Sequence, residues 1–233
     1  MGTYFDLSYM VQSFPIILSF VDTTIEITVV AILVGLAIGI VAALIRLNRV
    51  KGLEKLVTIY ISFMRGTPFL VQLFLVYFGM PEVLRKIGYD GVREIPPLFY
   101  VFLVFALHVG AYTAEIFRSA IAAVDKGQLE AAYAMGMGSV QAYCRIVLPQ
   151  AFAMAIPGLC NTVISTIKGT SLVFNVGVID MMRKADLMGA NSQRSFELYI
   201  DVAIIYILLV LLVSSGARFL EKQYPVPGKG GTT

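Results

Sequence analysis

Three otherwise apolar stretches of this sequence carry polar side chains at the spacing of one helical face. Arg65 and Gln72 are seven residues apart, and the other two sets are spaced by three and four residues. These sets are His108, Tyr112 and Glu115 in one stretch and Asn161, Ser165 and Lys168 in the next. Residues three, four or seven positions apart share one side of an α-helix. We therefore expect three polar helix faces, on which Arg65 and Lys168 can bind an anion and Glu115 a cation.

Two interpretations of these polar faces remain open. A charged side chain inside a bilayer costs about 2.5–3.5 kcal/mol and normally faces the bundle interior or water. The faces therefore either line a shared path or pair with one another, for example Lys168 with Glu115. With one histidine and two cysteines, Cys144 and Cys160, we expect no metal site.

The elements that position these residues must be membrane-spanning helices. The chain is 58% hydrophobic and 14% charged, whereas soluble domains carry roughly 25% charged residues. A spanning helix needs about 20 mostly apolar residues. Five stretches meet this length, namely Ile27–Ile45, Leu56–Phe78, Ile95–Ala114, Ile146–Ile167 and Ile200–Ala217. The sequence predicts an all-α membrane protein with about five transmembrane helices.

The N-terminal segment has a different composition. Leu7–Val21 is apolar but contains Pro15, Gln12 and several serines, so we interpret residues 1–26 as an interfacial or re-entrant lead-in. A sixth span in this segment is the alternative. Residues 27–220 then form the transmembrane domain, and residues 221–233 form a tail.

The loop charges predict an orientation. The loops after the first and third spans and the C-terminal tail hold most of the basic side chains, including Arg46, Arg49, Lys126 and Arg218, while the other loops are rich in Asp and Glu. Cytoplasmic loops are enriched in Lys and Arg. We therefore expect the N-terminus outside and the C-terminus inside, which requires an odd number of spans.

The long inner loop, residues 118–148, carries the most specific motif. Its composition predicts a short helix, a glycine break at Gly136 and Gly138, a second short helix and re-entry at Pro149, since glycine tolerates backbone angles that other residues avoid. The spacing of the motif resembles the EAA loop of ABC importer permeases. Its matching residues are Glu130, Ala131, Ala132, Gly136, Ile146, Leu148 and Pro149.

Further segments resemble the polar amino-acid (histidine, glutamine, arginine and cystine type) subfamily of these permeases. They are Arg65-Gly66-Thr67-Pro68 followed by Gln72, Tyr112 to Arg118, and Lys168-Gly169-Thr170-Ser171-Leu172. The family usually has Asp where this chain has Gly169, which removes a negative charge near the expected pore. The resemblance implies the type I ABC importer permease fold.

The resemblance also implies a function and partners. The chain would be the permease subunit of an importer for polar amino acids in the bacterial plasma (inner) membrane. A cytoplasmic ATPase dimer would bind the EAA loop and hold the ATP and Mg. A second permease, identical or related, would complete the pore. An extracytoplasmic binding protein would deliver the amino acid. No phosphate-binding loop is present, so we expect no enzymatic activity and no cofactor on this chain, and no nucleic-acid partner.

On this interpretation the polar faces form the substrate path. Arg65 or Lys168 would meet the carboxylate of an amino acid, and Glu115 its ammonium group. The expected path residues are Arg65, Thr67, Gln72, Tyr112, Glu115, Asn161, Lys168, Thr170 and Ser171.

Two other functions were weighed. A self-contained secondary carrier or channel for small polar solutes is the alternative, although carriers commonly contain inverted repeats and none is evident here. An intramembrane protease would need a paired nucleophile and base in the spans, and the sequence has none. The motifs do not identify which amino acid is transported.

Overall fold

The computed structural model describes residues 5–89, 91 and 94–224, and all regular structure among them is helical. Four segments are long and apolar enough to cross a membrane: α2 (Val21–Leu47), α6 (Pro97–Ala123), the continuous segment Ser139–Thr170 and α11 (Ser195–Gln223). A bent pair, Leu53–Gly66 with Phe69–Lys86, raises the number to five. The predicted all-α membrane protein with about five spans is confirmed.

The second expected span is not one straight helix. α3 (Leu53–Gly66) ends before Pro68, and α4 (Phe69–Phe74) continues through a π-helical turn (Leu75–Gly79) into α5 (Met80–Lys86). The two halves meet at 117°. Proline lacks a backbone N–H and disfavours the helical conformation in the residue before it, and Thr67 is extended with φ −117° and ψ 147°. The expectation of an unbroken Leu56–Phe78 helix was therefore wrong.

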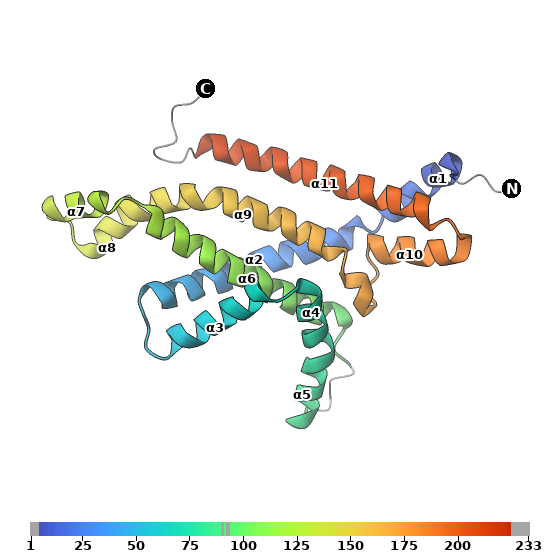
Figure 1. Ribbon diagram of the computed structural model, residues 1–233, viewed down its shortest axis with the longest axis horizontal. Coiled ribbons are helices and arrows are strands. Elements are labelled where there is room, and N and C mark those ends of the chain that lie inside the picture. The colour runs from blue at the N-terminus through green and yellow to red at the C-terminus, as the bar shows by residue number, and fades with distance from the viewer. Residues whose placement is uncertain (1–4, 90, 92–93, 225–233) are drawn as a thin grey trace.

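α6 lies at the centre of the molecule, between α2, α3 and α9 (Leu148–Thr170) (Figure 1). Its apolar side chains join α2 and α4 in one buried cluster that includes Ile27, Leu73 and Phe105. The 3₁₀ turn Val173–Val176, which follows α9, packs into the same cluster. This core holds α2, α4 and α6 together, and α9 is joined to it through the turn that follows α9.

The N-terminal lead-in contains a short helix that packs with one side against two other helices. α1 (Leu7–Leu18) contacts α11 and α10 (Met181–Ser192), and Ile17, Met181 and Leu198 are fully buried among them. α2 begins at Val21, six residues before the expected start of the first span at Ile27. Residues 1–4 lie outside the described part of the chain.

Most of the other helices are longer than the apolar stretches that predicted them, because the helical conformation continues beyond the apolar residues. α6 runs to Ala123, so the first residues of the expected loop 118–148 are helical. α8 (Ser139–Ala142) passes through a π-helical turn (Tyr143–Val147) into α9 without a break, so the end of that loop is also part of a spanning segment. Residues 225–233 of the expected tail lie outside the described residues.

The loops assigned to one side by their charge lie at one end of the molecule. α7 (Lys126–Ala134) with α8, the α2–α3 turn and the C-terminal end of α11 gather at the left of Figure 1, and α1 and α10 lie at the right. α5 projects away from the other helices.

Candidate functional site

The segment between α6 and α9 forms a glycine-hinged elbow, defined here as residues 124–147. The Asp125 carboxylate accepts a hydrogen bond from the Gly127 N–H at 2.8 Å and so caps α7. α7 then ends before Gly136, whose φ of +78° lies in the left-handed region that favours glycine. The predicted helix, glycine break and second helix are present.

The elbow is attached to the bundle by small buried side chains. Ala132 is 3% exposed and Ala142 is fully buried, while Ala131 and Glu130 face outward. Val147 joins Ala120, Val124 and Ala151 in a cluster that fastens the elbow to the end of α6 and the start of α9. Of the other motif residues, Ile146 is half-buried, and Leu148 and Pro149 are exposed at the start of α9. A force on the elbow would therefore act directly on these two helices.

The tip of the elbow exposes apolar side chains in a polar segment. Met135 is 82% exposed and Val140 is 79% exposed, the highest values among the large hydrophobic side chains of the described residues. They flank Gly136, and Tyr133 and Tyr143 are about half exposed beside them. Exposed apolar patches commonly mark protein interaction sites. Met135 and Val140 were not predicted as functional residues. The sequence indicated them only by placing apolar residues beside a glycine break.

A cluster of one carboxylate and three guanidinium groups lies where α6 approaches the elbow. Glu115 accepts a hydrogen bond from Arg46 Nη1 at 2.8 Å and two from Arg118 Nε at 3.0 and 3.1 Å. Arg65 Nη1 is 3.9 Å from the same carboxylate. Glu115, which we expected to meet an ammonium group, is thus occupied by arginines, and Lys168 forms no ion pair with it. We call Arg46, Arg65, Glu115 and Arg118 the charge cluster.

Gln72 also has a different set of partners from the one expected. It is 1% exposed, and its Nε2 donates to the Met64 and Thr67 carbonyl oxygens at 2.7 and 2.9 Å and lies 2.9 Å from Thr67 Oγ1. Its Oε1 is 2.9 Å from His108 Nδ1. The amide therefore joins the broken span to α6 and satisfies carbonyl groups that the break leaves without helical partners.

A pocket of about 400 Å³, which we call the α6–α9 pocket, is lined by apolar side chains such as Phe69 and Phe105 and by several polar ones. It brings together members of two predicted polar faces, His108 and Tyr112 from α6 with Asn161 and Ser165 from α9. The rings of His108 and Tyr112 are 4.7 Å apart. Gly169 also lines the pocket, so the position where the family has Asp faces this space.

The other expected path residues lie outside this pocket. Lys168 is exposed, and Ser171 donates to its carbonyl oxygen at 2.7 Å. Thr170 is fully buried, with its hydroxyl 3.1 Å from that of Tyr206. Arg65 lies with its guanidinium 5.7 Å from the ring centre of Tyr112. The pocket and the charge cluster are thus adjacent through Tyr112.

Two buried carboxylates at the opposite end were not singled out by sequence analysis. Asp201 is fully buried and accepts a hydrogen bond from Ser13 at 2.6 Å, which fastens α1 to α11. Asp180 is also fully buried, caps α10 through the Arg183 N–H at 2.9 Å, and has its pKa raised by burial. These groups position helices and do not line the α6–α9 pocket.

Comparison with known proteins gives concordant results. Residues 35–224 match the family model described as "Binding-protein-dependent transport system inner membrane component". The L-cystine transport system permease protein TcyL of Bacillus subtilis (strain 168) is 38% identical over 94% of this chain and 91% of its own length. The probable amino-acid ABC transporter permease protein PatM of Vibrio harveyi is 39% identical over 90% of this chain and 92% of its own.

Solved structures show the same fold. An amino acid ABC transporter crystallised with histidines matches with a TM-score of 0.85 and 34% identity over 96% of this chain and all of that one. The MetNI methionine ABC transporter, in an inward-facing conformation, matches with a TM-score of 0.66 and 17% identity over 89% of this chain and 94% of that one.

Proposed function

Since the chain belongs to the family of inner membrane components of binding-protein-dependent transport systems, we propose that it is the permease subunit of an ATP-driven importer for polar amino acids. The substrate class is supported by relatives described as cystine and amino-acid permeases and by the subfamily motifs. The family assignment favours this function over a self-contained carrier or channel.

The elbow supports the proposed coupling to a separate ATPase. Glu130 and Ala131 face outward on α7, and Met135 and Val140 are the most exposed large apolar side chains described. Burial of such side chains by a partner removes apolar area from water and favours association. In this proposal the elbow lies in the cytoplasm and docks on an ATPase dimer, which holds the ATP and Mg. A second permease and an extracytoplasmic binding protein complete the transporter.

A chain of contacts connects the α6–α9 pocket to the elbow. Tyr112 lines the pocket and lies next to Arg65, which is 3.9 Å from Glu115. Arg118 binds the same carboxylate and also lines the cavity against the elbow. We propose that movement of the elbow is transmitted along this chain to the pocket.

The docking surface is tested by a double variant, Met135→Ser with Val140→Ser. We expect the amount of ATPase that co-purifies with the permease to fall by about tenfold, since well-packed interface side chains each contribute more than about 1 kcal/mol. Ile87→Ser is the matched control, because Ile87 is 73% exposed and lies at the end of α5. Unchanged ATPase recovery with the double variant would exclude the elbow as the docking site.

The substrate path is proposed at the pocket, with Tyr112 and Asn161 as its polar groups. The other expected path residues stay predictions as substrate ligands, since the structure gives most of them other partners. They are Arg65, Thr67, Gln72, Glu115, Lys168, Thr170 and Ser171. We expect Asn161→Ala to raise KM for uptake by roughly fivefold, the loss of about one hydrogen bond. Ser215→Ala on the exposed side of α11 serves as control. An unchanged KM would contradict the pocket as the substrate site.

A further inference from the structure

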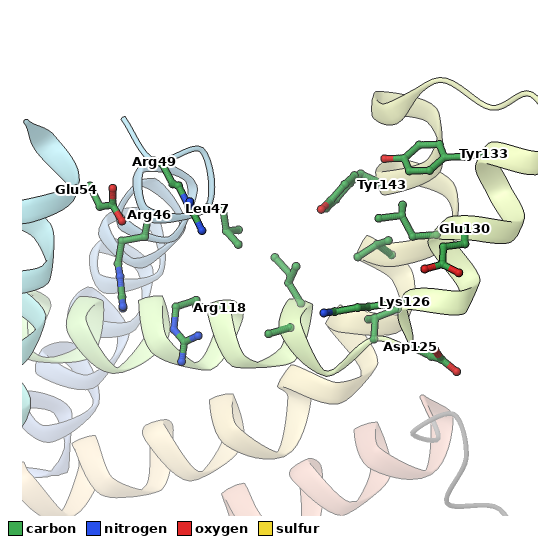
Figure 2. Close-up of a pocket in the computed structure, with 15 residues that line it drawn as sticks. Arg46, Leu47, Arg49, Glu54, Arg118, Asp125, Lys126, Glu130, Tyr133 and Tyr143 are labelled. Carbon is green, nitrogen blue, oxygen red and sulfur yellow. The ribbon is translucent and has the colours of Figure 1, made fainter. Parts of the chain in front are cut away.

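A large cavity lies between the α2–α3 turn, the end of α6 and the elbow (Figure 2). Its volume is about 760 Å³, and four cationic side chains line it. Arg46 lies in the last turn of α2, Arg49 in the α2–α3 turn and Arg118 on α6, and Lys126 is the first residue of α7. These cations come from separate parts of the chain, and three acidic residues, Glu54, Asp125 and Glu130, line the same cavity.

An apolar groove of about 360 Å³ continues from this cavity along the helices. Leu47 and Ile121 line both spaces, so the cavity and the groove meet. The groove follows α2, α6 and α9, and its outer residues Ile40, Leu44 and Phe152 are 45%, 52% and 51% exposed. Every side chain that lines the groove is Ala, Ile, Leu or Phe.

We propose that this cavity and groove together bind one anionic phospholipid. The phosphate would lie among Arg49, Lys126 and the nearby arginines, and an acyl chain would lie in the groove. A cationic pocket at the end of membrane helices is the surface that attracts anionic headgroups. A soluble anion would fill the cavity and leave the groove empty, whereas a phospholipid matches both.

The distribution of charges in the cavity indicates which cations are available. Arg46 and Arg118 already share Glu115. Arg49 and Lys126 are exposed and form no ion pair among the described residues. In Figure 2 both basic groups extend toward the cavity, whereas Asp125 points away and caps α7. Arg49 and Lys126 are therefore the principal phosphate ligands.

Of the three acidic residues that line the cavity, Asp125 turns its carboxylate away in Figure 2, whereas Glu54 and Glu130 remain beside it. A carboxylate repels phosphate but accepts hydrogen bonds from hydroxyl groups. A headgroup that has hydroxyls beside its phosphate can interact with both kinds of side chain. Phosphatidylglycerol is thus a suitable probe.

Arg49 has an unusual backbone conformation. Its φ is +48°, in the left-handed region that a residue with a Cβ rarely adopts, and its N–H bonds to the Arg46 carbonyl oxygen at 3.3 Å. Glycine adopts this conformation without strain. The Arg49→Gly variant therefore removes the positive charge and is compatible with the backbone conformation of the turn.

The leaflet follows from the proposed function, which places the elbow in the cytoplasm. The lipid would belong to the cytoplasmic leaflet and would contact both the α2–α3 turn and α7. It would thus hold the coupling elbow against the bundle.

Native mass spectrometry of the intact transporter, titrated with dioleoyl phosphatidylglycerol or dioleoyl phosphatidylcholine, tests the headgroup site. We expect tighter retention of phosphatidylglycerol, weakened roughly fivefold by each of Arg49→Gly and Lys126→Gln, since a cation near a membrane surface contributes about that factor. Lys51→Gln is the control, an exposed cation of the same turn that does not line the cavity. Equal retention of the two lipids, or an equal effect of the control, would overturn the proposal.

Ile40→Trp tests the groove, with Leu33→Trp as control. Both residues are exposed on α2, and only Ile40 lines the groove. We expect Ile40→Trp alone to reduce lipid retention. Displacement of the lipid by millimolar glycerol 3-phosphate would indicate a site for soluble phosphates and overturn the lipid assignment. An unchanged number of bound lipids in Ile40→Trp would also overturn the lipid assignment. Occupation of the groove by the second permease would overturn it as well.

Failure of the proposed function gives a different result. If the elbow faced the exterior, phosphatidylglycerol would still be retained by the intact protein, but the ATPase would not co-purify. If only the lipid proposal fails, ATPase binding persists and the lipid preference is lost.

Discussion

One amide side chain holds the broken span against α6. Gln72 donates to the Met64 and Thr67 carbonyl oxygens before the break and also contacts His108 on α6. The sequence placed Gln72 on a polar face, and its contact with His108 agrees with that placement. Its partners across Pro68 were not foreseeable, because the bend at this position is what brings them within reach.

Gln72→Ala tests this interpretation. The variant leaves buried carbonyl oxygens and the His108 ring without a partner, at a cost of about 1–3 kcal/mol for each unsatisfied buried group. We expect the melting temperature of the purified permease in detergent, measured by intrinsic tyrosine fluorescence, to fall by several degrees. Gln12→Ala is the control, since Gln12 bonds only to Ser8 on the exposed side of α1. An unchanged melting temperature would show that the amide does not hold the break.

The charge cluster shows why the ionic partners of a span are hard to predict from sequence. Glu115 and Arg118 are one helical turn apart and could be paired by spacing alone. Arg46, however, lies 69 positions earlier, at the end of another helix. The pairing of Glu115 with Lys168 that we considered requires α9 to turn Lys168 inward, and the structure leaves that side chain exposed.

At the scale of elements, the close contact between α2 and α6 depends on glycines, which have no side chain. A Cβ at Gly35 would lie 2.5 Å from Val109 Cγ1, and one at Gly39 would lie 2.6 Å from Thr113 Cβ. Gly110 of α6 has the same relation to Ile38. The Gly-x-x-x-Gly spacing on α2 indicates close helix packing, and the structure identifies α6 as the partner.

Gly39→Ala is expected to separate these helices. The added methyl group cannot be accommodated without moving Thr113 or the Gly110 carbonyl, and overpacking of this kind costs about 1–3 kcal/mol. Thermal unfolding in detergent should show a lower melting temperature. Gly216→Ala on α11 meets nothing within 4 Å and should leave stability unchanged or raise it by up to about 1 kcal/mol, the helix penalty of glycine. Equal effects of the two variants would contradict the packing argument.

Hydropathy predicts some of these helices and fails to predict others. Long apolar runs predicted the spans, and the glycine spacing predicted the elbow, because composition and backbone freedom are local properties. α10 was missed because its twelve residues include three charged side chains and no apolar run. Its only local indication is Asp180, which caps it. The bend at Pro68 was missed because a hydropathy window averages over it.

At the scale of the whole molecule, topology and charge agree. The elbow, the α2–α3 turn and the end of α11 lie at one end in Figure 1, and these are the segments that carry Arg49, Lys126 and Lys222. The fold therefore places the basic loops on a common side without reference to a membrane. Which side faces the cytoplasm rests on the enrichment of Lys and Arg in cytoplasmic loops.

Cys144 provides a direct test of this orientation. It is exposed on the elbow, whereas Cys160 lies half-buried on α9, so a Cys160→Ser variant carries one accessible thiol. A membrane-impermeant maleimide should label this variant in inverted membrane vesicles and leave it unlabelled in right-side-out vesicles. Cys144→Ser with Cys160→Ser gives the background, and labelling after detergent addition gives the total. Labelling from the exterior would invert the topology, and since the ATPase is cytoplasmic, the elbow would then be unable to reach its motor.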